Sequence, residues 1–456
     1  MNGITEFLNR LRGYGDREAI VEPSRSWSYT ELLSACEEVR RAIDASDLQS
    51  GDALEVRAEH GCLGIAGLLG SWASGIVAVP VNPSVSVTTV DRLRDIAHVR
   101  GELDLDPIGV RIESGPDPDP PLPYRRLIAA DVPGLVLFTS GSSGEPKGVV
   151  HDVDRLLTRF EDRRPAAKVA AFLLFDHIGG VNTVLHTLAH GGCVVTMPDR
   201  SPRVVAERIQ TEGVQVLPTT PTYLNMLAIA QELPRLASLE LITYGTEVMP
   251  ASTLAAVREA LPHVRLLQTY GMSELGIVRS RSVDESTWVS IGGPELEWRV
   301  IDGTLRIRTT TAMAGYLNAP DPFDGDGWFD TGDEVEVDGD RIRFLGRRDD
   351  TINVGGQKVH PATVESVIAE VRGVLDVAVA AEPTPLTGHL VAATVYTGQS
   401  DPGLRSQIRA RIRAACLASL EPWQVPARIR FTDSPMATDR FKRDRQNRPF
   451  GVTQIT

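Results

Sequence analysis

The sequence predicts an α/β protein with a large N-terminal domain of layered, mostly parallel sheets with helices, a β-rich subdomain and a small α+β C-terminal domain. From Ala19 to about Tyr270, short apolar runs bounded by Gly, Pro or Asp alternate with longer stretches of helical period, which is typical of strands joined by crossover helices. After Gly292 the pattern changes to strand-like pieces, and after Gly356 a self-contained unit follows.

The individual elements follow from apolar periodicity and from turn residues. The predicted strands of the large domain are Gly134–Phe138, Val169–Phe175, Cys193–Met197, Val214–Leu217, Leu239–Tyr244 and Val264–Thr269. The predicted helices between them include Val153–Phe160, Pro202–Thr211, Pro221–Gln231 and Ala251–Ala260. Glu113–Tyr124 is predicted to be a loop, because its five prolines can neither donate ladder hydrogen bonds nor continue a helix.

The later elements divide the chain into two domains. In the β-rich part, Glu334–Val337 and Arg341–Leu345 flank an Asp338-Gly339 hairpin signal. The last unit is predicted to contain helices at Thr363–Val371 and Leu404–Leu420 and strands at Val374–Ala380 and Leu390–Tyr396. We therefore predict an N-terminal domain over residues 1–346, a hinge over 347–350 and a C-terminal domain over 351–456.

Charge and composition exclude several classes of function. The formal net charge is −13, which argues against a nucleic-acid partner, because such proteins need basic surfaces that neutralise phosphates. The four cysteines are scattered without CxxC spacing, so neither a zinc site nor a disulfide framework is indicated. No apolar run is long enough to span a membrane or to act as a signal peptide, and we expect a cytoplasmic protein.

The strongest local signal lies between Leu137 and His151. An apolar strand opens into small and hydroxylated residues and then a lysine: Thr139, Ser140, Gly141, Ser142, Ser143, Gly144 and Lys147. Small residues let backbone N–H groups converge on an anion, while hydroxyls and the ammonium add donors and charge. The segment is predicted to bind phosphate, although it lacks the GxxxxGK spacing of a P-loop.

This loop and five later motifs in the same order resemble the superfamily of adenylate-forming enzymes. That superfamily contains acyl- and aryl-CoA synthetases, the adenylation domains of peptide synthetases, and firefly luciferase. The resemblance covers nearly the whole chain, including SWASGIVAVPVNPS in Leu68–Ser84. It implies that the chain uses ATP and Mg²⁺ to turn a small-molecule carboxylic acid into an acyl adenylate, with release of pyrophosphate.

The resemblance also implies roles for particular residues. Tyr270-Gly271-Met272-Ser273-Glu274 matches the Tyr-Gly-x-Thr-Glu motif. By that match Glu274 ligates Mg²⁺, Ser273 contacts the α-phosphate, Tyr270 and Gly271 lie near the adenine, and Met272 faces the acid. One carboxylate together with phosphates is a common way to hold Mg²⁺.

Two further nucleotide-binding motifs precede the predicted hinge, and a third spans it. Tyr244-Gly245-Thr246-Glu247 resembles the loop that lines the adenine, and Trp328–Asp333 resembles the motif whose aspartate, here Asp333, binds the ribose hydroxyls. Phe344–Pro361 matches the hinge motif, in which Arg347 contacts ribose or phosphate and Asp349 absorbs the rotation of a mobile C-terminal domain.

The C-terminal segment Pro435–Lys442 resembles the motif whose lysine, here Lys442, bridges the carboxylate and the α-phosphate. Phe441 stands where the family has glycine. The adjacent basic run Arg440–Arg448 has a second interpretation, a solvated patch or one that faces a carrier protein.

The acceptor and the acid remain open at this point. Gly355 and Gly356 resemble the glycine pair of CoA synthetases and are predicted to line a thiol channel, which favours CoA over the phosphopantetheine of an acyl or peptidyl carrier protein. The segment Phe175–Gly180 lies where the family builds its acid pocket, so Asp176, His177, Gly179 and Gly180 are candidate pocket residues. An aspartate at this place would pair with an amino-acid substrate, whereas a histidine would gate the pocket of a CoA ligase.

Three hypotheses therefore remain. The first is an AMP-forming acid–thiol ligase that uses CoA, with carrier-protein loading of an amino or aryl acid as its close alternative. The second is a relative that applies the same chemistry to a non-thiol nucleophile, such as an amidating or nitrite-activating enzyme. The third is a non-catalytic nucleotide-binding homologue, which would be expected to lose Glu274, Asp333 or Lys442, whereas all three are present.

Overall fold

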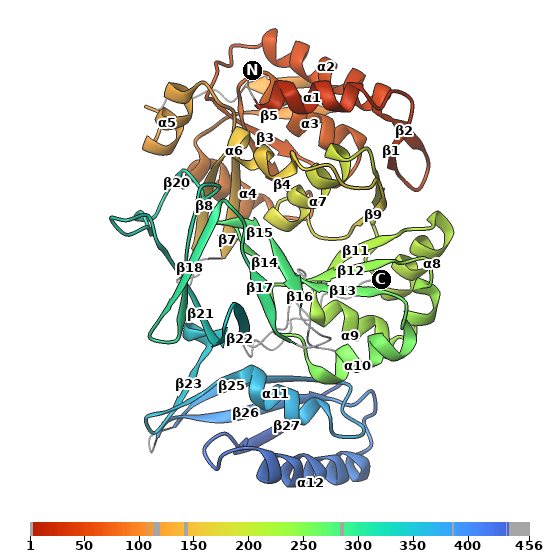
Figure 1. Cartoon of the computed structure of the whole chain (residues 1–456), viewed down its shortest axis with the longest axis vertical. Coiled ribbons are helices and arrows are strands. Elements are labelled where there is room, and N and C mark those ends of the chain that lie inside the picture. Colours follow the sequence, from red (N-terminus) through yellow and green to blue (C-terminus); the bar gives the residue numbers. More distant parts are fainter. Residues whose placement is uncertain are drawn as a thin grey trace.

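The computed structural model confirms the predicted α/β class (Figure 1). It describes residues 3–106, 108–112, 119–140, 145–282, 287–384, 387–434 and 436, with the side chains of 112 and 140 excepted. Within these ranges the chain forms two seven-stranded sheets, a six-stranded sheet, a five-stranded sheet and one two-stranded ribbon.

The first large sheet is almost entirely parallel. Its order is β13 (Arg265–Gln268), β12 (Leu241–Tyr244), β11 (Val216–Thr219), β9 (Lys168–Ala171), β10 (Cys193–Thr196), β1 (Glu18–Val21) and β2 (Ser26–Ser28). Only β2 runs antiparallel to its neighbour. The carboxyl ends of β9, β11, β12 and β13 therefore meet at one edge, where open α/β sheets place their ligands.

The second large sheet is mixed, so the expectation of mostly parallel sheets holds for the first sheet alone. Its order is β20 (Gly315–Tyr316), β8 (Pro146–Asp152), β7 (Gly134–Ser140), β4 (Val77–Val81), β3 (Ala53–Arg57), β5 (Val99–Leu105) and β6 (Ile108–Ile112). Pairs β7–β8, β8–β20 and β5–β6 are antiparallel. The predicted phosphate loop is thus the connection of the β7–β8 hairpin, which brings Thr139 opposite Lys147.

Helices cover both faces of the two sheets. One apolar core joins strands of both sheets to α1 (Gly3–Arg12), α2 (Tyr29–Asp44), α3 (Cys62–Ala73), α6 (Val153–Leu157) and α7 (Ile178–Ala189). The first sheet packs its other face on α8 (Pro202–Glu212), α9 (Pro221–Ile229) and α10 (Ala251–Ala260). The second sheet packs on α4 (Val87–Ala97) and α5 (Leu122–Ala130). Short 3₁₀ helices span Thr158–Phe160, Leu233–Leu236 and Arg348–Asp350.

Two sequence predictions need correction. Residues 122–124 of the predicted proline loop form the first turn of α5, because proline is tolerated where helix N–H groups have no intrahelical partner. The strand predicted to reach Phe175 ends at Ala171, and the apolar residues after it turn away from the sheet toward the amino end of α7. An apolar run alone does not distinguish strand from buried loop.

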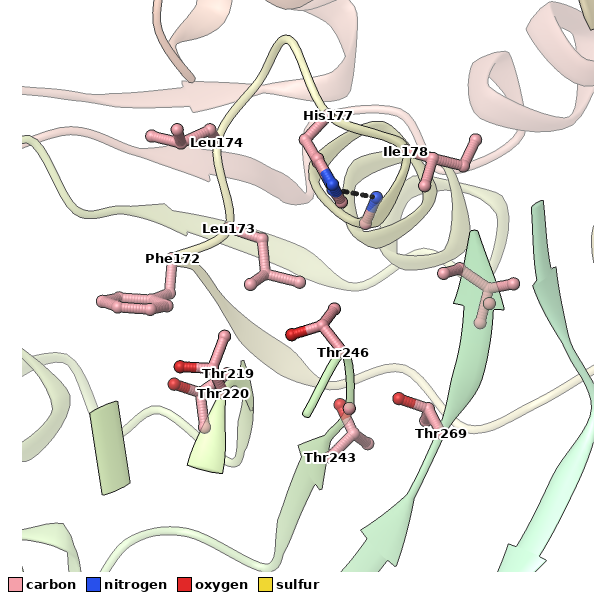
Figure 2. Close-up of a pocket in the computed structure, with 14 residues that line it drawn as sticks. Phe172, Leu173, Leu174, His177, Ile178, Thr219, Thr220, Thr243, Thr246 and Thr269 are labelled. Carbon is pink, nitrogen blue, oxygen red and sulfur yellow. Dashed lines mark hydrogen bonds between the residues drawn. The ribbon is translucent and has the colours of Figure 1, made fainter. Parts of the chain in front are cut away.

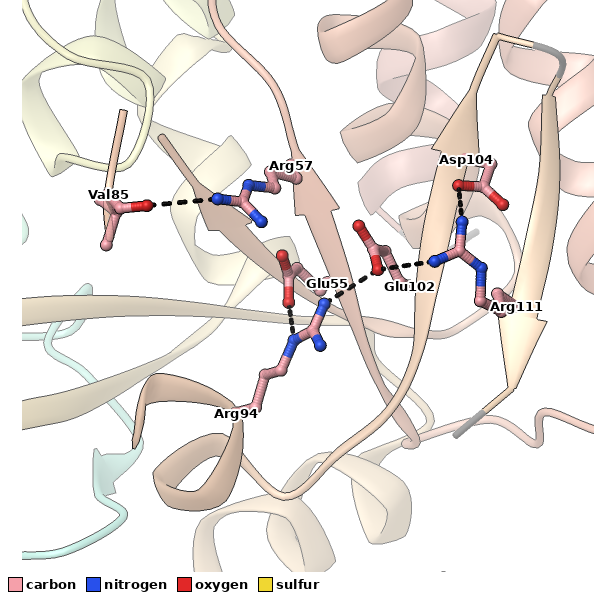
Figure 3. A network of polar contacts seen from close by, with 7 residues as sticks. All are labelled: Glu55, Arg57, Val85, Arg94, Glu102, Asp104 and Arg111. Atoms are coloured by element: carbon pink, nitrogen blue, oxygen red, sulfur yellow. Dashed lines mark hydrogen bonds and ion pairs between the residues drawn. The ribbon is translucent and has the colours of Figure 1, made fainter. Parts of the chain in front are cut away.

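A buried carboxylate fastens α4 to the second sheet (Figure 3). Glu55 on β3 is fully buried, and its Oε2 accepts a hydrogen bond from Nε of Arg94 at the end of α4. The guanidinium of Arg94 also contacts Glu102 on β5 at 2.9 Å, and Arg111 on β6 pairs with Asp104 at 2.7 Å. Burial raises the pKa of Glu55 against the opposing charge of Arg94. The network aligns three neighbouring elements of this sheet.

The β-rich subdomain and the C-terminal domain complete the chain. The six-stranded sheet runs β16 (Ser280–Ser282), β17 (Val289–Ile291), β22 (Arg341–Arg347), β21 (Phe329–Asp338), β19 (Thr304–Thr309) and β18 (Leu296–Ile301), and the ribbon pairs β14 (Tyr270–Met272) with β15 (Gly276–Val278). The last unit contains β23 (Ile352–Val354), β24 (Gln357–Val359), β25 (Asp376–Thr384), β26 (Gly388–Tyr396), β27 (Arg428–Thr432), α11 (Pro361–Ala369) and α12 (Pro402–Ser419). Figure 1 places this unit, in blue, at the foot of the molecule. None of the helices in the described ranges is both long and apolar enough to cross a bilayer.

Two buried histidines, His60 and His151, and the half-buried His186 predict a loss of stability in mild acid. Burial lowers the pKa of His60 to about 3 and the pKa of His151 and His186 to about 4, from an ordinary value of 6.5. As the pH falls from 6.5 toward 4, these histidines therefore bind protons in the unfolded chain but stay neutral in the folded chain. We expect each histidine to remove about 1 kcal/mol of stability per pH unit in that window.

The measurement is the thermal midpoint at pH values of about 7, 6 and 5, with His60→Phe as the test variant. The His60 ring packs edge-on against Phe175 with ring centroids 5.2 Å apart, so phenylalanine fits the same contact without titrating. We expect a smaller fall of the midpoint in His60→Phe than in the parent. Glu55 acts in the opposite direction, because its raised pKa favours the folded state as the pH falls. A midpoint that is unchanged or rises toward pH 5 would contradict the prediction.

Candidate active site

A cleft of about 470 Å³ lies at the carboxyl edge of the first sheet, between that sheet, the β7–β8 hairpin and the β-rich subdomain. It brings together most residues that the sequence singled out. Predicted site residues that line it are Thr139, Lys147, His177, Thr246, Glu247, Tyr270, Gly271, Met272, Ser273, Glu274, Asp333, Arg347 and Asp349. Motifs up to about two hundred residues apart in sequence thus share one cavity.

The loop after β12 has a constrained backbone. A Cβ atom on Gly245 would lie 2.5 Å from the carbonyl oxygen of Thr269, so only glycine fits there. Thr246 adopts φ of +71°, which is costly for a β-branched residue and is typical of functional sites. The carboxylate of Glu247 accepts a 2.6 Å hydrogen bond from the hydroxyl of Thr222 at the start of α9. These contacts hold the loop against the cleft.

Tyr270, Asp333 and Arg347 form one polar cluster. The Tyr270 hydroxyl donates to Asp333 Oδ2 at 2.6 Å, its ring stacks on Phe344 with centroids 4.7 Å apart, and Nε of Arg347 lies 3.4 Å from Asp333 Oδ1. Burial raises the pKa of Asp333, although the positive charge of Arg347 opposes this shift. Burial and the neighbouring Asp333 charge both raise the pKa of Tyr270 well above its ordinary value. The phenol therefore stays protonated and orients the carboxylate toward the cleft.

Glu274 and Lys147 are joined by a residue that sequence reasoning missed. The Tyr316 hydroxyl donates to Glu274 Oε1 at 2.8 Å, and Nζ of Lys147 lies 5.3 Å from the centre of the Tyr316 ring. Tyr316 is on β20, which pairs with β8 beyond Lys147. The one feature of the local sequence that could have pointed to Tyr316 is the preceding glycine, Gly315, which has φ of +146° in the structure. The pairing of β20 with a distant strand could not be seen in the sequence.

Ser273 lies at the floor of the cleft and is 5 % exposed. A second residue that the sequence analysis did not assign, His151 on β8, sits behind it and shares a backbone hydrogen bond with Ser273. Burial lowers the pKa of His151 to about 4, so the imidazole is neutral at physiological pH. It supports the Ser273 backbone without adding charge to the cleft.

A smaller pocket of about 70 Å³ adjoins the cleft (Figure 2). His177, Thr246, Thr269 and Gly271 line both cavities, and Gly245 and Gly179 line the pocket. His177 also caps α7, because its Nδ1 accepts the Gly179 N–H at 3.2 Å.

Three residues that the sequence assigned to the acid pocket do not line this smaller pocket. Asp176 lines neither cavity, Met272 lines only the cleft, and Gly180 lies against the Leu174 backbone, where a Cβ atom would be 1.9 Å from the carbonyl oxygen.

The C-terminal domain reaches the cleft through Pro361 and Ala362 at the start of α11. It also contacts Glu334 of β21, which lies 3.1 Å from Nζ of Lys358 and accepts a 2.9 Å hydrogen bond from Thr351. Burial alone would raise the pKa of Glu334, but these two partners lower it overall.

The predicted hinge and thiol-channel residues lie close to that contact. Asp349 lies in the 3₁₀ turn Arg348–Asp350. Gly355 and Gly356 form the exposed β23–β24 turn with φ of +58° and +91°, and neither lines the cleft or the pocket.

Several predicted site residues lie outside the described residues, namely Gly141, Ser142, Ser143, Gly144, Phe441 and Lys442, and the Ser140 side chain with them. Their roles stay predictions.

This site is typical of a nucleotide-binding α/β enzyme. It combines the carboxyl edge of a parallel sheet with Lys147 on the β7–β8 hairpin and the carboxylates of Glu274 and Asp333 in the same cleft. Comparison with protein families then identifies the family to which this enzyme belongs. The family "AMP-binding enzyme" matches residues 7–101 and 97–317, and "AMP-binding enzyme C-terminal domain" matches residues 363–442. The chain therefore belongs to the AMP-binding enzymes of the adenylate-forming superfamily, as the sequence motifs indicated.

Curated relatives include stand-alone ligases and parts of peptide synthetases. The chain is 25% identical to a 3-[(3aS,4S,7aS)-7a-methyl-1,5-dioxo-octahydro-1H-inden-4-yl]propanoyl:CoA ligase of Rhodococcus jostii, with 93% of each chain covered. It is 27% identical to a sulfoacetate–CoA ligase of Cupriavidus necator, with 92% of each covered. It is 28% identical to a probable non-canonical nonribosomal peptide synthetase of Salinispora arenicola, covering 87% of this chain and 5% of that protein.

Solved structures share the fold at lower identity. An anthranilate CoA ligase in complex with anthranoyl-AMP superposes with a TM-score of 0.81 at 18% identity, covering 95% of this chain and 94% of the other. An amide bond synthetase from Marinactinospora thermotolerans superposes with a TM-score of 0.79 at 23% identity, covering 97% and 98%.

Proposed function

We propose that the chain is an AMP-forming acid–thiol ligase that activates a carboxylic acid as an acyl adenylate and then transfers the acyl group to CoA. The observation that carries this proposal is the single cleft that gathers Lys147, Glu274, Asp333 and Arg347 beside a smaller, mostly apolar pocket. A nucleotide and an acid can therefore meet at the shared wall formed by His177 and the loop after β12. The near full-length match to CoA ligases supports the same activity.

In this proposal the nucleoside lies between the Gly245–Glu247 loop and Tyr270, and Asp333 binds the ribose. Tyr270 occupies Oδ2 of Asp333, so the ribose hydroxyls approach Oδ1, which Arg347 contacts at 3.4 Å. That distance is long for a hydrogen bond, and the guanidinium is free to turn toward a phosphate when the ribose arrives. The cluster thus exchanges one weak ion pair for a charge-assisted contact with the ligand.

The phosphates would lie between the β7–β8 hairpin and the β14–β15 ribbon. Thr139 and Lys147 face them from the hairpin, and Ser273 from the ribbon. In the resemblance Ser140 to Gly144 add backbone and hydroxyl donors. Donors and charges that are in position before substrate arrives would stabilise charge that develops in the transition state.

Glu274 is the residue that would hold Mg²⁺. No group of three or more His, Cys, Asp or Glu side chains lies in metal-binding range within the described ranges, whereas one carboxylate plus phosphate oxygens suits Mg²⁺. Bound there, the ion would neutralise phosphate charge. The hydrogen bond from Tyr316 to Oε1 orients the Glu274 carboxylate that would hold the ion.

The reaction needs little covalent help from the protein. A carboxylate oxygen of the acid forms a bond to the α-phosphorus of ATP, and the bond from that phosphorus to the bridging oxygen breaks, so pyrophosphate leaves with the electron pair. The thiolate of CoA next attacks the acyl carbon, and AMP leaves with its oxygen. The chain positions the reactants, excludes water and neutralises charge in both steps.

The acceptor is the finer part of the proposal. Gly355 and Gly356 both have positive φ. Because they carry no side chains, they would let the narrow arm of CoA pass close to the backbone after the rotation about Asp349 that the resemblance implies. The phosphopantetheine of a carrier protein has the same arm, so carrier loading is the close alternative. An amine acceptor is a further alternative, suggested by the fold shared with an amide bond synthetase.

A pyrophosphate-release assay over aliphatic, aromatic and amino acids tests this proposal, with each acid run with and without CoA. We expect ATP- and Mg²⁺-dependent pyrophosphate release and a thioester that forms only when CoA is added. Pyrophosphate release with no CoA thioester would exclude CoA and favour a carrier protein or an amine. No release with any acid would contradict the whole proposal.

A further inference from the structure

The turn that carries Ser273 and Glu274 depends on support from neighbouring elements, and the inference drawn from it rests on the proposed function. The turn joins β14 to β15, which pair only with each other in the described part of the chain. A lone pair of strands is at best marginally stable in water. The position of the Glu274 carboxylate is therefore set by the groups that pack against this turn.

Hydrogen bonds hold the turn at the carbonyl groups of Met272, Glu274 and Leu275. The Leu275 N–H closes the turn on the Met272 carbonyl at 3.2 Å, and the Met313 N–H donates to the Glu274 carbonyl at 2.9 Å. Nη2 of Arg159 donates to the Leu275 carbonyl at 3.3 Å. The first two bonds come from backbone amides, whereas the third comes from a charged side chain.

Arg159 belongs to the 3₁₀ helix Thr158–Phe160 and packs tightly on the turn. A Cβ atom on Gly276, which has φ of +72°, would lie 2.5 Å from Nη1 of Arg159. Glycine at this position therefore leaves the space that the guanidinium occupies. Neither Arg159 nor Leu275 nor Gly276 lines the cleft or the smaller pocket, so Arg159 would act on a ligand only through the turn.

The Arg159 side chain carries a charge that its contact with the turn does not require. Burial lowers the pKa of Arg159 to about 10, which leaves the guanidinium charged at neutral pH. The carboxylate of Glu295 opposes this shift but pairs with Arg279 at 3.1 Å, and Arg159 forms no ion pair within the described ranges. A neutral donor would satisfy the Leu275 carbonyl without the unfavourable desolvation of a cation. The charge is therefore suited to a negative ligand on the other face of the turn.

We propose that Arg159 is a positioning residue for adenylate formation. Its hydrogen bond to Leu275 and its packing on Gly276 fix the turn, so that the Glu274 carboxylate is in place to hold Mg²⁺ and Ser273 is in place to meet the phosphates. Its charge adds to the positive field that favours phosphates at this turn.

Binding of Mn²⁺ tests this role directly, because it needs no turnover. Mn²⁺ replaces Mg²⁺ as a probe and is titrated by electron paramagnetic resonance in the presence of saturating α,β-methylene-ATP, which the reaction cannot cleave. Arg159→Met keeps an unbranched side chain but removes the charge and the donors, and we expect the Mn²⁺ affinity to fall by about tenfold or more. The kcat for pyrophosphate release should fall by a similar factor with KM for the acid within about threefold, and raised Mg²⁺ should recover part of the rate.

Two further variants separate positioning from general support of the fold. Arg159→Lys keeps the charge but not the planar fork, so we expect a loss of Mn²⁺ affinity of about threefold or more that stays smaller than in Arg159→Met. Arg208→Met is the matched control, because Arg208 on α8 also donates to backbone carbonyls, those of Thr196 at 2.6 Å and Val21 at 2.9 Å, and lines neither cavity. This control should keep the parent Mn²⁺ affinity and kcat, and a thermal melt of each variant reports whether it folds.

A folded Arg159→Met whose Mn²⁺ affinity and kcat stay within about threefold of the parent would overturn the inference, and so would equal losses in Arg208→Met. If Arg159→Met does not fold, Arg159→Lys decides, and Mn²⁺ affinity equal to the parent's would overturn the inference there as well. If the parent released no pyrophosphate with any acid, the proposed function would fall, while the Mn²⁺ titration would still decide the role of Arg159.

Discussion

Replacing Glu274 by glutamine is expected to lower kcat/KM for acyl-adenylate formation by roughly a hundred- to a thousandfold. The substitution keeps the shape and the hydrogen bond from Tyr316 but removes the negative charge that would hold Mg²⁺ opposite Lys147. A neutral amide is a much weaker ligand for a hard cation than a carboxylate. The measurement is pyrophosphate release over a range of Mg²⁺ concentrations, and raised Mg²⁺ should recover part of the activity.

Two further variants separate this role from a structural one. Tyr316→Phe removes only the hydroxyl that contacts Glu274 and is expected to cost about several-fold, since the carboxylate remains. Glu297→Gln removes an exposed carboxylate on β18 that pairs with Arg308 and lines neither cavity, and it should leave the rate unchanged. A Glu274→Gln enzyme within about threefold of the parent rate at low Mg²⁺ would show that the metal is held elsewhere.

Replacing Lys442 by alanine is expected to lower acyl-adenylate formation by a similar factor while sparing the second half-reaction. Lys442 lies outside the described residues, and its role rests on the Pro435–Lys442 motif. An ammonium that bridges the carboxylate and the α-phosphate acts only while the adenylate forms. Thioester formation from a preformed acyl adenylate and CoA should therefore stay within about threefold of the parent.

Arg443→Ala is the matched control for this variant, because it removes the adjacent positive charge from the same basic run. It should leave both half-reactions close to the parent rate. If Lys442→Ala slowed both half-reactions equally, or if Arg443→Ala were equally harmful, the basic run would act as a general charged surface and the specific role of Lys442 would be wrong.

The sequence predicted most of the cleft because its residues stand in short motifs at strand ends. Asp333 and Glu274 were assigned from such motifs, and both line the cleft with Tyr270. Sequence reasoning missed Tyr316 and His151 because their contacts depend on strand pairing and on packing between layers.

Long-range geometry also explains the weaker part of the acid-pocket prediction. His177 and Gly179 line the pocket as expected, whereas Asp176 precedes them by one or a few residues and lines neither cavity. Local sequence indicates that a segment borders a pocket but does not say which side chain enters it.

A crystal structure of the chain with ATP and Mg²⁺ tests the central claim most directly. We expect the ribose on Asp333, the adenine beside the Gly245–Glu247 loop, and the phosphates between Lys147 and Glu274, with the metal on the Glu274 carboxylate. Nucleotide bound elsewhere, with the cleft between β7–β8 and β14–β15 left empty, would contradict the account.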